Sequence, residues 1–292
     1  MTNYKGYMGK VLFVDLKDKT YKEFPWTDKD RERTVGGKIM AADILLNHIK
    51  PGMKAFDEDN WIVITTGPLT RCKSPSSTRF NISTISPLTG ILTSSNCGGP
   101  FGRRLKKAGW DAMIITGKAD ELTWIEIDND IVTFHDVPEM RGMLTGEAQK
   151  KFASGNGKLV IGPAGENKVL YAAAFSGERA AGRGGVGAVF GDKNIKAITA
   201  RGNQEPEIYD QERLNFLNVQ WTAQLKRHPI TGAQLSKLGT AGLVAPMQAH
   251  RILATKNFSE GRFENFEKVS GEELTEKYIY IIFSRRKFYE ML

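Results

Sequence analysis

The sequence predicts an α+β fold in which a strand-rich first part is followed by the start of a helical part. Up to Gly202, short apolar or alternating runs follow one another with frequent turn signals between them. After that point, residues 211–227 and 240–250 have the composition and spacing of helices, although Pro246 is expected to kink the second. Glycine and proline in the polar stretch at the change predict a domain boundary at about residue 205.

The elements of the first part are expected in close succession. Apolar or alternating runs predict strands at residues 9–16, 20–24, 61–66, 79–85, 91–95, 111–116, 123–127, 131–135, 158–161, 171–175, 186–190 and 195–200. Helical spacing predicts helices at 38–49, 103–108 and 145–153. Thr145 is the expected N-cap of the last of these helices. Asp128-Asn129-Asp130 is a hairpin signal, and Gly162 to Gly165 reads as a turn.

Composition narrows the class of protein. The chain has 292 residues and a formal net charge of +8, without a long Lys/Arg block that would indicate nucleic-acid binding. A positive field that attracts anionic ligands is the interpretation we adopt. No stretch reaches the ~18 apolar residues of a membrane span. We therefore expect a protein with neither nucleic acid nor membrane as a partner.

Cysteine and histidine give little support for a metal site made of side chains. The two cysteines, Cys72 and Cys97, form no C-x-x-C pair, so this chain alone cannot hold a four-cysteine cluster. Two cysteines and no signal peptide predict a cytoplasmic protein. The four histidines show no metal-ligand spacing: His48, His135, His228 and His250.

A glycine-rich stretch, Glu178 to Gly187, is the most informative part of the sequence. Small residues let a backbone approach a ligand closely, and the arginines beside them can bind phosphate. Gly182 to Gly187 also fits the dinucleotide pattern G-x-G-x-x-G, which requires a helix directly after it. We expect a strand there, at residues 186–190. A turn between strands, an anion cradle and a nicotinamide-dinucleotide site remain as alternatives.

A second stretch, Arg79 to Gly102, has the same character. Arg79 alone reads as a surface arginine at a strand start. Asn96 beside two glycines reads as a turn residue, and Cys97 as a small core residue. Taken together, the two stretches indicate a binding site more specifically than either does alone.

Seven segments, in order and spacing, resemble the tungsten- or molybdenum-containing aldehyde:ferredoxin oxidoreductases. They are Gly67 to Thr70, Arg79 to Asn81, Ser86 to Gly90, Asn96 to Gly102, Ala108 to Ala112, Gly162 to Asn167 and Arg179 to Gly187. The resemblance covers roughly residues 9–277. It implies that residues 1–205 form a β-rich N-terminal domain of two sheets beneath the cofactor, and that 206–278 begin a helical second domain.

The resemblance also implies a cofactor and its contacts. The cofactor is tungsten or molybdenum held by two pterins, whose phosphates are bridged by Mg²⁺. By motif position, its binding residues are Arg79, Asn96, Gly98, Arg179, Ala180 and Gly182. The main-chain carbonyls of Asn96 and Ala180 are the implied magnesium ligands, because Mg²⁺ prefers hard oxygens.

The implied reaction is oxidation of an aldehyde to a carboxylic acid at the metal. Electrons leave through a 4Fe-4S cluster to ferredoxin or an electron-transfer subunit, and a homodimer is left open as the oligomeric state. The family's C-x-x-C-x-x-x-C cluster segment is absent after Tyr278, so 279–292 are expected to be a divergent tail. We expect a truncated, non-catalytic fragment if this chain acts alone.

Overall fold

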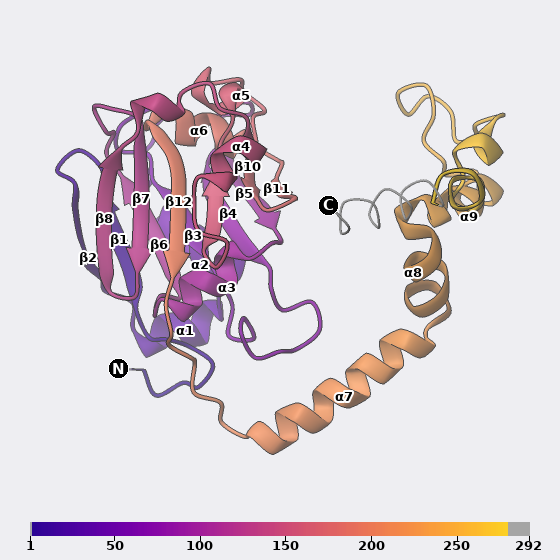
Figure 1. Cartoon of the computed structure of the whole chain (residues 1–292), viewed down its shortest axis with the longest axis horizontal. Coiled ribbons are helices and arrows are strands. Elements are labelled where there is room, and N and C mark those ends of the chain that lie inside the picture. The colour runs from indigo at the N-terminus through magenta and orange to yellow at the C-terminus, as the bar shows by residue number, and fades with distance from the viewer. Residues whose placement is uncertain (1, 280–292) are drawn as a thin grey trace. The chain divides into compact units, whose positions relative to one another are not determined.

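The computed structural model describes residues 2–279 and divides into two compact units, Met1–Gln211 and Glu212–Leu292. Two mixed six-stranded sheets and several short helices make up the first unit, which confirms the predicted α+β class. Figure 1 shows the strands packed together with short helices around them. The domain roles expected for 1–205 and 206–278 stay predictions. The expected tail at 279–292 lies, except for the backbone of its first residue, outside the described residues.

The first sheet has the strand order β2-β1-β6-β3-β4-β5. Its strands are β1 (Val11–Asp15), β2 (Thr20–Phe24), β3 (Ile62–Thr65), β4 (Phe80–Ile85), β5 (Leu92–Cys97) and β6 (Ala112–Thr116). Only β1 and β6 pair in parallel; the other neighbours are antiparallel. The helices of this part are α1 (Asp28–Thr34), α2 (Gly37–Leu46) and α3 (Phe101–Lys107).

The second sheet has the strand order β11-β10-β9-β12-β7-β8. Its strands are β7 (Thr123–Asp128), β8 (Ile131–Asp136), β9 (Gly157–Val160), β10 (Ala174–Ser176), β11 (Arg179–Ala181) and β12 (Ile195–Arg201). Its helices are α4 (Thr145–Lys150), α5 (Pro163–Glu166) and α6 (Val186–Asp192), with a 3₁₀ turn at Pro138–Met140. The hairpin predicted at Asp128 to Asp130 is confirmed, because β7 and β8 pair antiparallel around it.

The first sheet is apolar on both faces because each face packs in a different apolar cluster. Leu12 and Val14 of β1 belong to the large cluster that also contains Ile125 and Ile198 of the second sheet. Val11, which faces the opposite side of the strand, packs in a separate cluster with residues of α2. The first sheet is therefore buried between α2 and the second sheet.

One predicted element has the wrong type. Residues 186–190, expected to be a strand, belong to helix α6, in which all seven residues are buried. A short apolar run does not distinguish a buried strand from a buried helix. Close packing decides it here: a Cβ at Gly191 would lie 1.8 Å from the Gly165 carbonyl oxygen, and one at Gly187 would lie 2.5 Å from that of Ala173.

Smaller differences concern element ends. The strand expected at 171–175 is shortened to β10, because residues before it form a turn in which the Ala172 N–H donates to Val169 O. The turn expected from Gly162 becomes α5, which starts with Pro163. The cap of α4 is Leu144 rather than Thr145, and the Leu144 N–H donates to the Glu147 carboxylate.

The second unit is helical, as predicted. It contains α7 (Gln211–Arg227, which starts one residue before the division), α8 (Leu235–Leu238), α9 (Val244–Ala249), α10 (Gly271–Leu274), 3₁₀ turns at Gly239–Leu243 and Phe266–Val269, and π-helical turns at Pro229–Gln234 and Thr275–Ile279. Pro246 does not kink a long helix, because it lies in the first turn of the short helix α9, where proline is tolerated. The exposed apolar side chains of α7 include Phe216, Val219 and Trp221.

Candidate cofactor-binding site

Residues from three places in the sequence meet at Gly98. A Cβ built on this buried glycine would lie 3.3 Å from Nη1 of Arg79 and 3.4 Å from Cγ of Arg179. Arg79 directly precedes β4, Gly98 follows β5, and Arg179 begins β11 of the second sheet. The fold thus brings together three of the residues that the resemblance singled out. We call Arg79, Gly98 and Arg179 the arginine cradle.

The loop after β5 is locked against the second sheet. Gly99 has a φ of +87°, and a Cβ there would lie 2.3 Å from the carbonyl oxygen of Ser176. The Phe101 N–H donates to Ser176 Oγ over 3.2 Å, and Ser176 is fully buried at the end of β10. Only glycine fits this close approach. Ser176 therefore fixes Gly98 relative to the β10–β11 hairpin, which carries Arg179.

The stretch 182–187 lies along the outer edge of the first sheet. The Arg183 N–H donates to Ser95 Oγ of β5 over 3.1 Å. A Cβ at Gly184, where φ is +73°, would lie 2.1 Å from Thr93 Oγ1. A Cβ at Gly182 would meet nothing within 4 Å, so packing does not require glycine at that position.

Asn96 and Ala180 lie on neighbouring strands at the same end of the two sheets. Asn96 pairs with Asn81 across β4–β5, and Ala180 pairs with Phe175 across β10–β11. Both residues are exposed. Strands β5 and β11 contact each other, so the sheets meet along this line.

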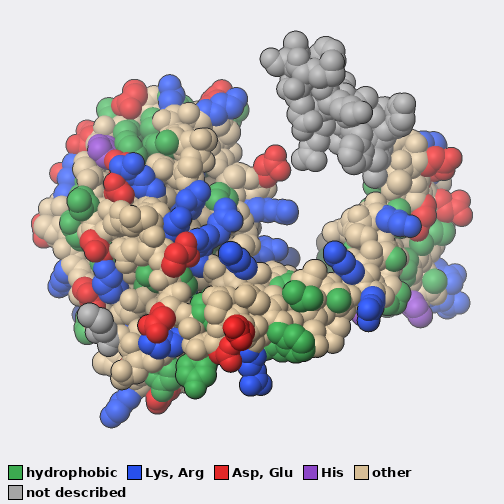
Figure 2. All heavy atoms as spheres, turned by 60° about the horizontal axis from the view of Figure 1, so that its bottom comes forward, with side chains coloured by type: hydrophobic (Ala, Val, Ile, Leu, Met, Phe, Trp, Pro, Cys, Tyr) green, Lys and Arg blue, Asp and Glu red, His purple; other side chains and the backbone are tan. Residues whose placement is uncertain are grey.

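The cradle carries uncompensated positive charge. Arg79, Arg179 and Arg183 are exposed, and none of them forms an ion pair with another of the described residues. On the face drawn in Figure 2, Lys and Arg side chains gather near the middle of the first unit. Clustered cations without acidic partners raise the local concentration of anions. The site is therefore suited to an anionic ligand.

Cys97 is not a reactive thiol in this setting. It is fully buried below the cradle, and burial raises its pKa to about 11, although Arg79 and Arg179 act in the opposite direction. A thiol with this pKa is neutral near pH 7, and the thiolate is the form that binds metals or attacks electrophiles. Its structural role agrees with the sequence interpretation.

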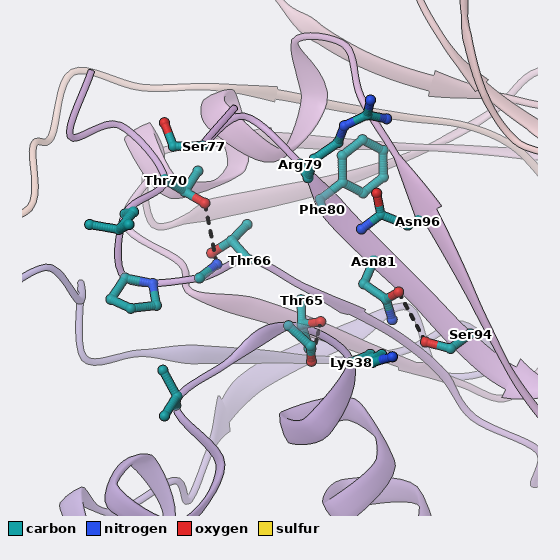
Figure 3. A pocket seen from close by; sticks show the side chains of 15 residues that line it. Lys38, Thr65, Thr66, Thr70, Ser77, Arg79, Phe80, Asn81, Ser94 and Asn96 are labelled. Atoms are coloured by element: carbon teal, nitrogen blue, oxygen red, sulfur yellow. Dashed lines mark hydrogen bonds between the residues drawn. The ribbon is translucent and has the colours of Figure 1, made fainter. Parts of the chain in front are cut away.

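A cavity of about 690 Å³ opens beside Arg79. Figure 3 shows residues from α2, β3, β4, β5 and the loop after β3 around it. Its polar lining includes Lys38, Thr65, Thr66, Thr70, Ser77, Arg79, Asn81, Ser94 and Asn96. Of these residues, the family resemblance predicted only Arg79 and Asn96. Except for Lys38, the others lie in or near the family segments, such as Thr70 in the segment Gly67 to Thr70, and this was the available signal.

Hydrogen bonds order one wall of this cavity. Ser94 Oγ donates to Asn81 Oδ1 over 3.0 Å, and Asn81 Nδ2 donates to Ser83 Oγ over 2.7 Å. The wall with Gly67 is held from behind by Lys106, whose buried Nζ donates to the Gly67 carbonyl over 2.7 Å. Burial lowers the pKa of Lys106, and Asp111 beside it acts in the opposite direction.

A nicotinamide-dinucleotide site does not fit the surroundings of Gly182 to Gly187. A helix does follow the glycines, contrary to expectation, so the local pattern is present. However, the strands on either side, β11 and β12, are separated in the sheet by β10 and β9, and every pairing along that path is antiparallel. β11 and β12 therefore run in opposite directions, whereas the dinucleotide motif needs a parallel βαβ unit. The alternative fails on topology.

Comparison with known proteins gives a consistent family. The model for "Aldehyde ferredoxin oxidoreductase, N-terminal domain" matches residues 11–202, and that for domains 2 and 3 of the same enzymes matches residues 217–281. Tungsten-containing aldehyde ferredoxin oxidoreductases from Pyrococcus abyssi and Pyrococcus horikoshii are 40% and 39% identical over 280 residues, which is 94% of this chain. The same alignments cover 46% of each relative.

Two further proteins show the range of this similarity. The WOR-like subunit of an aliphatic sulfonate oxidoreductase from Pyrococcus furiosus is 34% identical over 73% of this chain and 37% of its own. The active-site complex BamBC of benzoyl coenzyme A reductase has a TM-score of 0.73 and 31% identity, covering 76% of this chain and 35% of that one. The chain spans less than half the length of these relatives. Through the domain match, it belongs to the aldehyde ferredoxin oxidoreductase family.

Proposed function

We propose that the first unit binds the phosphate-bearing part of a tungsten–pterin cofactor, and that the whole protein oxidises aldehydes to carboxylic acids. The observation that carries this proposal is the meeting of Arg79 and Arg179 over Gly98, without an acidic partner in the described residues. The relatives named for tungsten support this metal over molybdenum.

The residues present fit such a group. The guanidinium groups of Arg79 and Arg179 would each hold phosphate oxygens, since arginine binds phosphate with two parallel hydrogen bonds. Gly98, Ala180 and Gly182 would let the ligand approach the backbone closely. A Cβ at Gly98 would contact both arginines, at 3.3 Å from Nη1 of Arg79 and 3.4 Å from Cγ of Arg179, and the space at Gly182 is open.

The main-chain carbonyls of Asn96 and Ala180 would hold the magnesium ion that the family resemblance implies. Mg²⁺ takes oxygen ligands and keeps several waters, so two protein carbonyls suffice. Residues 2–279 contain no group of three or more His, Cys, Asp or Glu side chains that could hold a metal. We therefore propose main-chain carbonyls, and not side chains, as the protein ligands of the ion.

The cofactor supplies the two-electron oxidation of the aldehyde when it is bound. The residues of this chain hold and orient it: the arginines neutralise its phosphates, and Ser176 and Gly99 fix the loop that carries Gly98. In the whole protein we propose a 4Fe-4S cluster and ferredoxin, or an electron-transfer subunit, as the path of the electrons.

We further propose a cytoplasmic location and leave a homodimer as the oligomeric state to be tested. No helix among the described residues is long and apolar enough to cross a membrane.

A second candidate is that these 292 residues, by themselves, bind the cofactor without turnover. The proposed contacts Arg79, Asn96, Arg179, Ala180 and Gly182 are all exposed, so the cradle covers a ligand from one side only. Cofactor sites usually bury 70–90% of the ligand surface. We expect no aldehyde-dependent dye reduction by this chain alone.

Metal and pterin content test the proposal. The protein is expressed anaerobically with tungstate and molybdate in the medium, purified, and analysed for both metals, magnesium and pterin. We expect tungsten and pterin in the parent, and little of either in the Arg79→Gln/Arg179→Gln double variant. Arg141→Gln is the control, because Arg141 is also exposed and lies outside the cradle. Equal contents in all three proteins would contradict the proposal.

A further inference from the structure

Lys38 is a second cation on the cavity that contains Arg79, and the family resemblance assigned it no role. It follows the first residue of α2 and is exposed, and its side chain forms no ion pair or hydrogen bond with another described residue. In Figure 3, Lys38 and Arg79 lie at two ends of the cavity, and Asn81, Ser94 and Asn96 lie between them. The Lys38 side chain extends toward the side with Ser94.

The chemistry of the lining indicates which ligand this cavity takes. Two cations line it with threonine, serine and asparagine side chains, and none of the fifteen lining residues is Asp or Glu. Beside them lie the apolar residues Val35, Pro68, Leu69 and Phe80. Lys5 and Arg33 elsewhere in the first unit have a carboxylate partner, whereas the cavity offers none to Lys38. A concave surface with unpaired cations and no acid favours an oxyanion.

The backbone before Lys38 is held in a costly conformation. Val35, Gly36 and Gly37 have φ values of 58°, 152° and 57°, and a β-branched residue such as Val35 rarely takes a positive φ. Such strain persists only where neighbours hold it in place.

Three hydrogen bonds hold residues 35–37 in this conformation. Tyr7 Oη donates to the Val35 carbonyl over 2.5 Å. The Gly37 N–H donates to Thr66 O, and Thr65 Oγ1 donates to Gly37 O, each over 2.9 Å. Thr65 and Thr66 also line the cavity, so the start of α2 is fixed to the cavity wall. Lys38 is therefore held beside the cavity by hydrogen bonds to strand β3 and its following loop, and does not lie on a free loop.

We propose that Lys38 is a second anion-binding residue, which holds an oxyanion at the end of the cavity away from the arginine cradle. The ligand therefore carries negative charge at two places, one at Arg79 and Arg179 and one at Lys38. This inference rests on the proposal that the cradle binds an anionic cofactor, and it adds a contact that the cradle does not supply. Phosphate and carboxylate share the required chemistry, since a lysine ammonium binds either as a point charge.

Calorimetric titration with inorganic pyrophosphate, and separately with benzoate, tests this at fixed ionic strength. The proteins are the parent, Lys38→Gln, Lys38→Arg and Arg79→Gln. Lys151→Gln is the matched control, because Lys151 is exposed, lies outside the cavity, and its loss changes the net charge equally. Circular dichroism confirms that each variant is folded, which we expect for an exposed position in the first turn of a helix.

We expect Lys38→Gln to weaken binding of at least one of the two anions about three- to tenfold, the size of one partly exposed charge contact. Lys38→Arg should restore it, and Lys151→Gln should leave it unchanged. Loss with pyrophosphate assigns the oxyanion to a phosphate; loss with benzoate alone assigns it to a carboxylate.

The outcomes separate this inference from the proposed function. If Arg79→Gln weakens pyrophosphate binding while Lys38→Gln matches the parent for both anions, the cradle stands and the role of Lys38 is refuted. If the parent binds neither anion, both proposals fail. If Lys38→Gln and Lys151→Gln weaken anion binding equally, the cause is the change in net charge, and the role of Lys38 is also refuted.

Discussion

The cations of the first unit fall into two groups with opposite surroundings. Lys106, Lys193 and Lys196 are at most 1% exposed, and each Nζ donates to main-chain carbonyls. Arg79 and Arg179 are exposed and have no acidic partner among the described residues. The buried lysines have hydrogen-bond partners within the fold, so their ammonium groups need no ligand. Arg79 and Arg179 have no such partners within the described part of the fold, and we propose that they bind a ligand.

The largest expected effect lies at the Lys196–Glu166 pair. Both side chains are buried, and Lys196 also donates to Met143 O over 2.9 Å. Lys196→Met should cost about 3–5 kcal/mol of unfolding free energy, because it leaves the Glu166 carboxylate buried without its partner. The Lys196→Met/Glu166→Leu double variant should recover much of this. Urea unfolding of both variants measures it, and a double variant as unstable as the single one would contradict our account.

A smaller effect is expected at Lys193, and it depends on pH. Burial lowers the pKa of Lys193 to about 8, while in the unfolded chain it titrates near 10.5. Between these values the unfolded state binds more protons, so this group makes the protein more stable as the pH rises from 8 to 10.5. Because one pKa unit corresponds to about 1.36 kcal/mol, the full rise is about 3 kcal/mol.

Urea unfolding at pH 8, 9 and 10 checks this contribution. Other groups titrate in the same window, so the comparison is with Lys193→Met, which should show a smaller rise in stability over the same range. Parallel pH profiles for the parent and Lys193→Met would show that Lys193 is not the cause.

Alanine substitutions at Gly99 and Gly182 distinguish a glycine that the fold requires from one that we propose contacts the cofactor. Gly99→Ala places a Cβ 2.3 Å from Ser176 O at a φ of +87°, and should cost about 1–3 kcal/mol and weaken anion binding. Gly182→Ala meets nothing within 4 Å and should change stability by less than about 0.5 kcal/mol. We nevertheless expect Gly182→Ala to lower cofactor content, measured as tungsten and pterin. Normal cofactor content in a folded Gly182→Ala protein would remove Gly182 from the site.

Most of the strands and the residues of the arginine cradle could be predicted from the sequence. Local patterns predicted the strands, and the family resemblance predicted the cradle residues. Alternating or apolar runs bounded by turns predicted β1, β4 and the β7–β8 hairpin from local chemistry alone. The family motifs picked out Arg79, Gly98 and Arg179, which the fold brings together.

Where prediction failed, contacts distant in sequence decide the structure. The run 186–190 became α6 because Gly187 and Gly191 pack closely on residues 165 and 173, which the local pattern does not contain. Lys38 was not recognised because its cavity forms only when α2 lies beside β3 and β4. A single lysine at a helix start gives no local signal of that arrangement.

Ligand-induced stabilisation tests the central distinction most directly. The unfolding free energies of the parent and the Arg79→Gln/Arg179→Gln variant are measured in urea with and without saturating pyrophosphate. If the arginines are kept for a ligand, the two proteins are about equally stable without the anion, and only the parent gains stability when it is added. A variant that is markedly less stable without the anion, or that gains as much as the parent with it, would contradict the account.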